Sequence, residues 1–406
     1  MLVAGVGVMV CRIAAFAALV MAIADAIGRC AIDVRTGGIR PRRLLLQLLL
    51  CGIPVLSCAP WADSRAATVQ LYGVVDTFMM HGRNGGTGTV RMGSGGVSDS
   101  FWGIRTVEDL GNGVRVSFRL EGDVDTTNGR QLHPTSTYNR EANIAVSSDA
   151  WGTLRLGRQY PAALPVSVDP FFFVQRFSPV AFFPQLVTDL GAGIAPLPQR
   201  IDNAISYQTP SMDGVVIYAV YAPRYSGNVG TGEISRNSDK FVNGYAGIQT
   251  NYSRGPWSLG ASYGAIRPAN PVGRNKVPLD SSRTDVIAIS AAHTTGALQT
   301  SIGYGRISSN VPGTYGAQMM SVGSLLLQGP HVFRALLLYR TINGRSDRTF
   351  GGVLGYDYQL SKRVSVYTRM AGFLNSSGSA FGIAANVPRE MGATTTTLAF
   401  GISQRF

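Results

Sequence analysis

Residues 114–121 read Val-Arg-Val-Ser-Phe-Arg-Leu-Glu, so that every apolar side chain is followed by a polar or charged one. Strict alternation is the period of a β-strand whose two faces meet different surroundings. Residues 257–265 repeat it, with Trp, Leu, Ala and Tyr on one face and only Ser and Gly on the other. The C-terminal residues 398–406 alternate in the same way. An apolar face opposite a small or polar face is typical of a water-filled barrel in a membrane.

Sixteen such segments follow one another along the chain, each of about 8 to 13 residues, which suits tilted transmembrane strands. They start near residues 68, 99, 113, 140, 152, 200, 213, 241, 256, 282, 297, 317, 331, 351, 363 and 393. Short turns alternate with long loops at 81–98, 126–139, 160–199, 224–240, 267–281, 308–316, 341–350 and 374–392. This order predicts an all-β fold, a 16-stranded antiparallel transmembrane β-barrel whose long loops all lie at the outer end. The alternative is a soluble β-sandwich or solenoid adhesin.

The composition excludes a helical membrane protein. The chain has 406 residues, of which 45% are hydrophobic, 15% are charged and 49 are glycines. No uninterrupted apolar run reaches the ~20 residues that a transmembrane helix needs. The four cysteines all lie within the first 58 residues, so the body of the protein contains none.

The N-terminal residues predict export. The basic residues at 40–43, the apolar run 44–56 and the small residues Ser64 and Ala66 together indicate a signal peptide at 40–66. Residues 1–39 precede this complete signal, and we interpret them as an extension that results from a start codon placed too early. A long natural signal and a lipid-anchored cysteine are the alternatives. The exported domain is then 67–406.

The positive charge of the exported domain is spread along the chain, which predicts an electric field across a cavity and not a binding site for a polyanion. Without the seven Arg and three Asp of residues 1–66, 36 basic and 23 acidic residues become 29 and 20, a net +9. No compact Lys/Arg run occurs, so nucleic acid is not an expected partner. Four histidines without metal-ligand spacing predict no metal or cofactor, and the absence of a Gly-x-Ser-x-Gly elbow and of a placeable Ser/His pair argues against an enzyme.

Several short motifs occur in order along residues 67–406. They are Leu71-Tyr72-Gly73-Val74-Val75-Asp76, Trp102-Gly103-Ile104-Arg105, Glu108-Asp109-Leu110-Gly111, Gly157-Arg158-Gln159, Asp202-Asn203-Ala204-Ile205-Ser206-Tyr207 and the terminal Phe406. In this combination the chain resembles the general diffusion porins of Gram-negative outer membranes. The resemblance implies a homotrimer of 16-stranded barrels, surrounded by lipid and lipopolysaccharide, that passes small hydrophilic solutes and ions. It also implies that the outer-membrane assembly machinery reads Phe406, whose ring can sit in the aromatic girdle.

The third long loop, 160–199, has 40 residues, well beyond the ~12–15 of ordinary structureless connections. The resemblance implies that it folds inward and forms the constriction of the pore. Its prolines stiffen it, and aromatic residues, including Phe171, Phe172 and Phe173, can wedge it against the wall. We therefore expect a narrow, partly apolar eyelet.

The resemblance further implies a column of wall arginines that faces acidic loop residues. Arg140 and Arg200 match by motif, although the alternation of its strand groups Arg140 with apolar residues. Arg105 and Arg119 join them because they lie on polar faces. Each arginine could instead be a rim charge that reaches lipopolysaccharide or water.

The expected acidic partners are Asp169 and Asp189, the acidic residues of the loop. One departure weakens the match to the family's arginine column and to its selectivity, because the arginine that family members place before the Trp-Gly pair is Phe101 here. We expect a passive outer-membrane channel with a mild anion preference. A substrate-specific channel, favoured by the aromatic loop, and a non-conducting adhesin are the alternatives.

Overall fold

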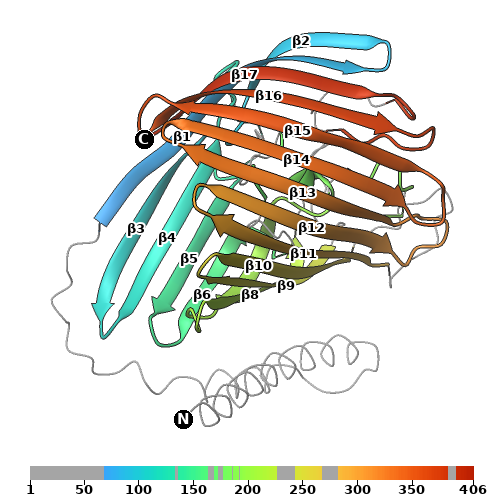
Figure 1. Ribbon diagram of the computed structural model, residues 1–406. Helices are drawn as coiled ribbons and strands as arrows, with labels where there is room; N and C mark the ends of the chain where they lie inside the picture. Colours follow the sequence, from blue (N-terminus) through green and yellow to red (C-terminus); the bar gives the residue numbers. More distant parts are fainter. Residues whose placement is uncertain are drawn as a thin grey trace, which may run out of the picture. The chain divides into compact units, whose positions relative to one another are not determined.

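The computed structural model describes residues 68–132, 136–162, 169–171, 177–184, 186–191, 193–225, 243–267, 282–382 and 390–406. Within them, seventeen antiparallel strands form one sheet that closes on itself (Figure 1). The strands are β1 (Thr68–Asn84), β2 (Thr87–Ser94), β3 (Phe101–Gly111), β4 (Val114–Asp123), β5 (Glu141–Ser148), β6 (Gly152–Gln159), β7 (Ile201–Gln208), β8 (Val215–Tyr225), β9 (Asn243–Arg254), β10 (Trp257–Arg267), β11 (Thr284–Thr295), β12 (Leu298–Ser309), β13 (Ala317–Gln328), β14 (His331–Ile342), β15 (Arg348–Gln359), β16 (Val364–Asn375) and β17 (Thr395–Arg405).

Sixteen of these strands make the barrel wall in chain order, which confirms the expected fold. β1 closes the ring because its first half pairs with β3 and its second half with β17. β2 is additional and pairs only with the second half of β1. The strand starts agree with the alternation to within about three residues.

The expectation that 81–98 is entirely loop is wrong. β1 continues to Asn84 and returns as β2 through the two residues Gly85 and Gly86. Gly85 has a φ of 58°, which a glycine adopts without steric cost and which suits a two-residue hairpin. This Gly-rich, polar stretch was predicted to be a loop because glycine, which has no side chain, does not contribute to the apolar–polar alternation that marks a strand.

The short connections are tight turns at one end of the barrel. Asn112 and Gly113 between β3 and β4 both have positive φ, 52° and 73°, as a type I′ hairpin requires. Asp213 and Gly214 before β8 repeat this with 50° and 88°. The loops 224–240 and 267–281 lie almost wholly outside the described residues.

The alternation sorts side chains between the outer face and the lumen. On β10, Trp257, Leu259 and Tyr263 are 49%, 41% and 37% exposed, whereas Ser262 between them is buried. On β17, Leu398, Phe400 and Ile402 are exposed and Ala399 is buried. In the described part of the chain no helix is long and apolar enough to cross a membrane.

Candidate functional site

The third long loop enters the barrel and packs against the wall opposite its origin. It leaves β6 after Gln159, contains the single turn α3 (Pro179–Phe182) and rejoins the wall at Ile201 of β7. Near its start, the Ala162 N–H donates to the Tyr245 hydroxyl of β9 at 3.2 Å. Near its end, the Ala195 N–H donates to Thr284 Oγ1 of β11 at 2.9 Å. These contacts confirm the inward fold.

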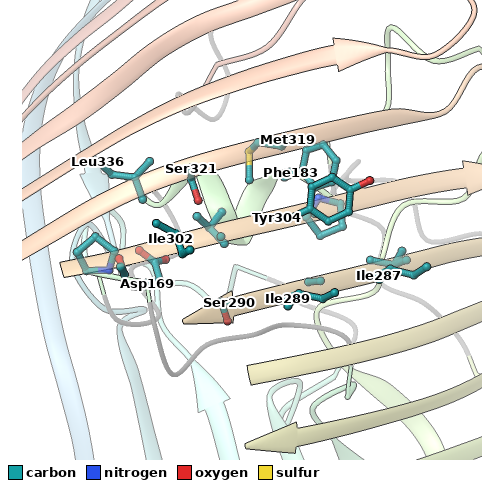
Figure 2. A pocket seen from close by; sticks show the side chains of 18 residues that line it. Asp169, Phe183, Ile287, Ile289, Ser290, Ile302, Tyr304, Met319, Ser321 and Leu336 are labelled. Carbon is teal, nitrogen blue, oxygen red and sulfur yellow. The ribbon is translucent and has the colours of Figure 1, made fainter. Parts of the chain in front are cut away.

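The described aromatic side chains of the loop face the wall and not the passage. Phe171, Phe177 and Phe183 are 0%, 2% and 3% exposed and belong to one apolar core with wall residues of β1 and β7–β17. Phe183 and Asp169 of the loop line one cavity together with the wall residues Met319, Ser321 and Leu336 (Figure 2). The cavity has a volume of only about 30 Å³. Phe172 and Phe173 lie outside the described residues. The aromatic rings that can be placed therefore fix the loop and form no slot for a solute.

A buried ion pair attaches the middle of the loop to the wall. Asp189 accepts from both terminal nitrogens of Arg340 on β14, each at 2.7 Å, and the two side chains are only 2% and 1% exposed. The Ala380 N–H donates to the same carboxylate at 3.0 Å. A bidentate, charge-assisted pair of this kind fixes orientation as well as position.

A second polar cluster lies at the tip of the loop. Asp357 of β15 pairs with Arg334 at 2.7 Å and with Arg369 at 2.6 Å. Arg334 also donates to the Pro170 carbonyl, and the Arg369 guanidinium lies 5.7 Å from the centre of the Phe171 ring. The loop tip is thus held by wall cations through its backbone and an aromatic face.

Asp169 is an internal contact of the loop. It is 4% exposed and accepts from the Ser178 hydroxyl and, at 2.9 Å, from the Phe171 N–H. Burial raises the pKa of Asp169 above its ordinary value, and these two hydrogen bonds together with nearby Arg334 offset only part of that rise.

The open part of the lumen wall carries two of the expected arginines. Arg105 on β3 and Arg119 on β4 lie opposite each other in the strand register. Arg105 is exposed and donates to the neutral Gln70 side chain at 2.6 and 2.9 Å. Arg119 has a 35% exposed side chain and pairs with Glu141 at 3.2 Å.

The other two expected arginines are buried where the loop joins the wall. The strand β5 begins at Glu141, so Arg140 precedes it and the parity of that strand does not govern its direction. Arg140 pairs with Asp99 and, at 3.4 Å, with Glu121, and it stacks on Phe101 at 4.4 Å. Phe101, which stands where the family has an arginine, therefore packs against the guanidinium of Arg140.

Arg200 lies beneath the loop junction with a tyrosine as its main partner. Its guanidinium stacks on Tyr160 at 3.4 Å and donates to the Tyr160 hydroxyl, to which Arg140 also donates at 3.3 Å. Burial lowers the pKa of Arg200, and the positive charge of Arg140 adds to that. Burial would also lower the pKa of Arg140, but Asp99, Tyr160 and Glu121 raise it above its ordinary value.

The structure does not bring these four arginines to Asp169 and Asp189. The acidic partners of Arg119 and Arg140 are Glu121 and Glu141 of the wall and Asp99, which lies just before β3. Strand alternation could have found Arg155, which lies between exposed Leu154 and Leu156 and contacts Glu141 at 3.9 Å. It also groups Arg334 and Arg340 on one face of β14, but it cannot say which loop residue they meet. Within the described ranges no group of three or more His, Cys, Asp or Glu side chains could hold a metal ion.

A family profile described as Gram-negative porin matches residues 50–378. The chain belongs to the Gram-negative porin family. This porin is 28% identical to outer membrane porin protein 32 of Delftia acidovorans over 83% of its own length and 92% of that protein. It is also 28% identical to an outer membrane porin protein of Bordetella pertussis, of which it spans 62% while the match covers 58% of its own chain. The chain is therefore a porin of the Gram-negative outer membrane.

Solved structures share the porin fold. An anion-selective porin from Comamonas acidovorans superposes with a TM-score of 0.67 at 22% identity, covering 84% of this chain and all of that one. OmpT of Vibrio cholerae superposes with a TM-score of 0.60 at 15% identity, covering 86% of this chain and all of OmpT.

The porin closes its barrel at the C-terminus. Phe406 exchanges two backbone hydrogen bonds with Gly73 of β1, at 3.1 and 3.2 Å. Its ring is 45% exposed on the outer face, and a Cβ on Gly73 would lie 2.5 Å from it. Glycine at position 73 thus leaves room for the terminal ring across the β1–β17 seam.

Proposed function

We propose that this porin forms a passive, water-filled channel for small hydrophilic solutes and ions, with a mild preference for anions and no catalytic role. The observation that carries the proposal is the wall between β3 and β7. Three arginines there, Arg119, Arg140 and Arg155, contact the carboxylates Asp99, Glu121 and Glu141. Two more, Arg105 and Arg200, contact the neutral side chains of Gln70 and Tyr160 instead.

The acidic side chains of the loop do not neutralise Arg105 and Arg200. Asp189 is neutralised by Arg340, and Asp169 is buried within the loop. Excess cationic charge on the wall of a narrow passage raises the local anion concentration and lowers that of cations. The relative from Comamonas acidovorans, named as an anion-selective porin, supports the same sign. The described aromatic rings pack on the wall, which favours unspecific diffusion over a substrate-specific channel.

We further propose that the porin works as a homotrimer in contact with lipid and lipopolysaccharide, after the assembly machinery has read Phe406. A structure of Vibrio cholerae OmpT described as a trimer form, which shares the fold at 15% identity, supports the trimer. Residues 40–66 are proposed as a cleaved signal and 1–39 as an extension absent from the natural product. Mass spectrometry of the intact protein from outer membranes tests this, since a mass that includes residues 1–39 contradicts it.

The decisive experiment is the reversal potential of the purified mature protein in a planar bilayer under a salt gradient. We expect a reversal potential of the sign that faster anion flux produces. We also expect that added solutes do not block the conductance in a saturable way. Clear cation selectivity would overturn the proposed preference. A solute that blocks the conductance in a saturable way would favour a specific channel.

A further inference from the structure

The strand β1 changes its neighbour on one side at Asp76. It pairs with β3 up to Val74 and with β2 from Thr77 onward. The chain passes from β2 to β3 through residues 95–100, which we call the strap. Asp76 therefore lies at a gap in the strand ladder, where its backbone groups need other partners.

Asp76 holds both ends of the strap. At the first end, the Gly96 and Val97 N–H groups donate to its carboxylate at 2.6 and 3.2 Å. At the second end, the Ser100 hydroxyl donates to the Asp76 carbonyl at 2.8 Å and accepts from the Asp76 N–H at 2.9 Å. The Tyr367 hydroxyl of β16 donates to the same carboxylate at 2.7 Å. The strap is thus attached to β1 at each end.

The strap lies on the inner face of the barrel wall. Asp76 is fully buried, whereas its neighbour Val75 is exposed on the outer face. Tyr367 is also buried, beside the exposed Val366. Gly96 of the strap has no room for a side chain, because a Cβ there would clash with the Tyr367 hydroxyl oxygen. The docked strap therefore packs directly against β16.

The strap carries an acidic side chain to the arginine at the root of the third loop. Asp99 forms an ion pair with Arg140, and the two side chains are 17% and 11% exposed. The carboxylate of Glu121 lies farther from this guanidinium, at 3.4 Å. Arg140 also donates to the Tyr160 hydroxyl, where the third loop begins. In a site that is largely shielded from water, the charge of Asp99 offsets that of Arg140.

We propose that Asp99 is a specificity-determining residue of the pore, and that the strap docked on Asp76 holds it in place and so limits the preference for anions. The inference rests on the proposed channel function and names the element that sets the strength of its selectivity. With the strap docked, the charge of Arg140 is offset and the field that favours anions is weak. When the strap leaves Asp76, Arg140 loses Asp99 and the pore selects anions more strongly. Asp76 acts through Asp99 and is a positioning residue.

Asp99→Asn tests the charge in the full mature porin, in planar bilayers at low salt. It should raise the anion-to-cation permeability ratio about fourfold, because one unit charge at ~8 Å in water changes the concentration of each ion about twofold and in opposite directions. The amides of Gly96 and Val97 should keep slow hydrogen exchange, since their acceptor Asp76 is unchanged. Asp213→Asn is the matched control and should leave the ratio unchanged, because it removes the same charge from an exposed turn at the short-turn end of the barrel.

Gly96→Ala tests the docking without a change of charge. The new methyl group would clash with the Tyr367 hydroxyl, so the strap should leave Asp76 and its amides should exchange at least about tenfold faster. The permeability ratio should rise as it does in Asp99→Asn. Gly86→Ala, in the β1–β2 turn where a Cβ meets no atom within 4 Å, is the matched control and should change neither measurement.

The double variant decides whether the strap acts through Asp99. Adding Gly96→Ala to Asp99→Asn should speed amide exchange and leave the permeability ratio where Asp99→Asn alone sets it. A further rise as large as that of Gly96→Ala alone would overturn the proposal, because the strap would then act by distorting the pore. Faster amide exchange in Gly96→Ala with the permeability ratio of the wild type would also overturn it.

Folding and the sign of the selectivity are controlled separately. If Gly96→Ala lacks heat-modifiable migration on a denaturing gel, Ser100→Ala takes its place, since it removes the second attachment to Asp76 without adding an atom. Cation selectivity of the wild type would refute the proposed anion preference and leave this test intact, because the test compares variants with the wild type. An Asp99→Asn ratio equal to that of the wild type would refute this inference and leave the channel function standing.

Discussion

Asp189→Asn is expected to release the third loop from the wall of the barrel. The carboxylate and Arg340 are 2% and 1% exposed, so the substitution leaves a buried guanidinium without its counter-charge. Removing one partner of a buried ion pair typically costs about 3–5 kcal/mol. Because the contact joins the loop to β14 and lies outside the strand ladders, that cost falls on loop docking and leaves the barrel closed.

The magnitude converts directly into a population. Since each 1.4 kcal/mol is a factor of ten, the undocked loop should become about 100 to 4,000 times more populated. Hydrogen exchange of the loop amides around Leu190, whose carbonyl also accepts from the Tyr315 N–H at 2.9 Å, measures this population. In single-channel records the same variant should show larger current fluctuations.

Two further proteins make the result interpretable. Asp149→Asn breaks an ion pair with Arg115 whose side chains are 76% and 40% exposed, so it should change loop exchange little. Asp189→Leu combined with Arg340→Met removes both charges and should restore slow exchange, because an apolar replacement of a buried pair is often neutral. Loop exchange in Asp189→Asn within twofold of the wild type would refute the reasoning, as would a double variant as labile as the single one.

Three other expectations concern the wall, the seam and the loop tip. Arg105→Gln with Arg119→Gln should shift the anion-to-cation permeability ratio several-fold toward cations, because the Arg105 side chain is exposed and that of Arg119 is 35% exposed; an unchanged reversal potential would place the selectivity elsewhere. Gly73→Ala should lower the heat-modifiable folded fraction, at a cost of about 1–3 kcal/mol, since the new Cβ would clash with the Phe101 carbonyl oxygen; normal folding would contradict this. Burial raises the pKa of Asp169, so its ionised form is disfavoured in the docked loop and loop stability should fall as pH rises from the ordinary aspartate value through the raised one. Asp169→Asn should flatten that dependence in hydrogen exchange, and an identical pH profile would count against it.

The wall of the barrel could be predicted from the sequence because its signal is local. A period of two is set by the backbone, so Trp257, Leu259 and Tyr263 face lipid wherever the strand lies. The alternation of short turns and long loops then gives the strand order. The same parity predicted that Arg105 and Arg119 lie on polar faces of their strands, and the register places them opposite each other. The alternation did not reveal the β1–β2 hairpin, because its glycines have no side chain to mark a face. It also did not predict the direction of Arg140, because that residue lies just outside β5.

The partners in the constriction depend on contacts between distant residues, which only the tertiary structure decided. Asp189 and Arg340 are 151 positions apart, and no local pattern distinguishes this pairing from one with Arg140 or Arg200. The wall offers the two loop aspartates several arginines of equal chemistry. Which arginine each aspartate meets depends on where the stiff loop backbone crosses the lumen and on which apolar part of the wall it covers. The charge pattern of the pore is therefore a property of the closed barrel and its docked loop, while the barrel itself is already encoded strand by strand.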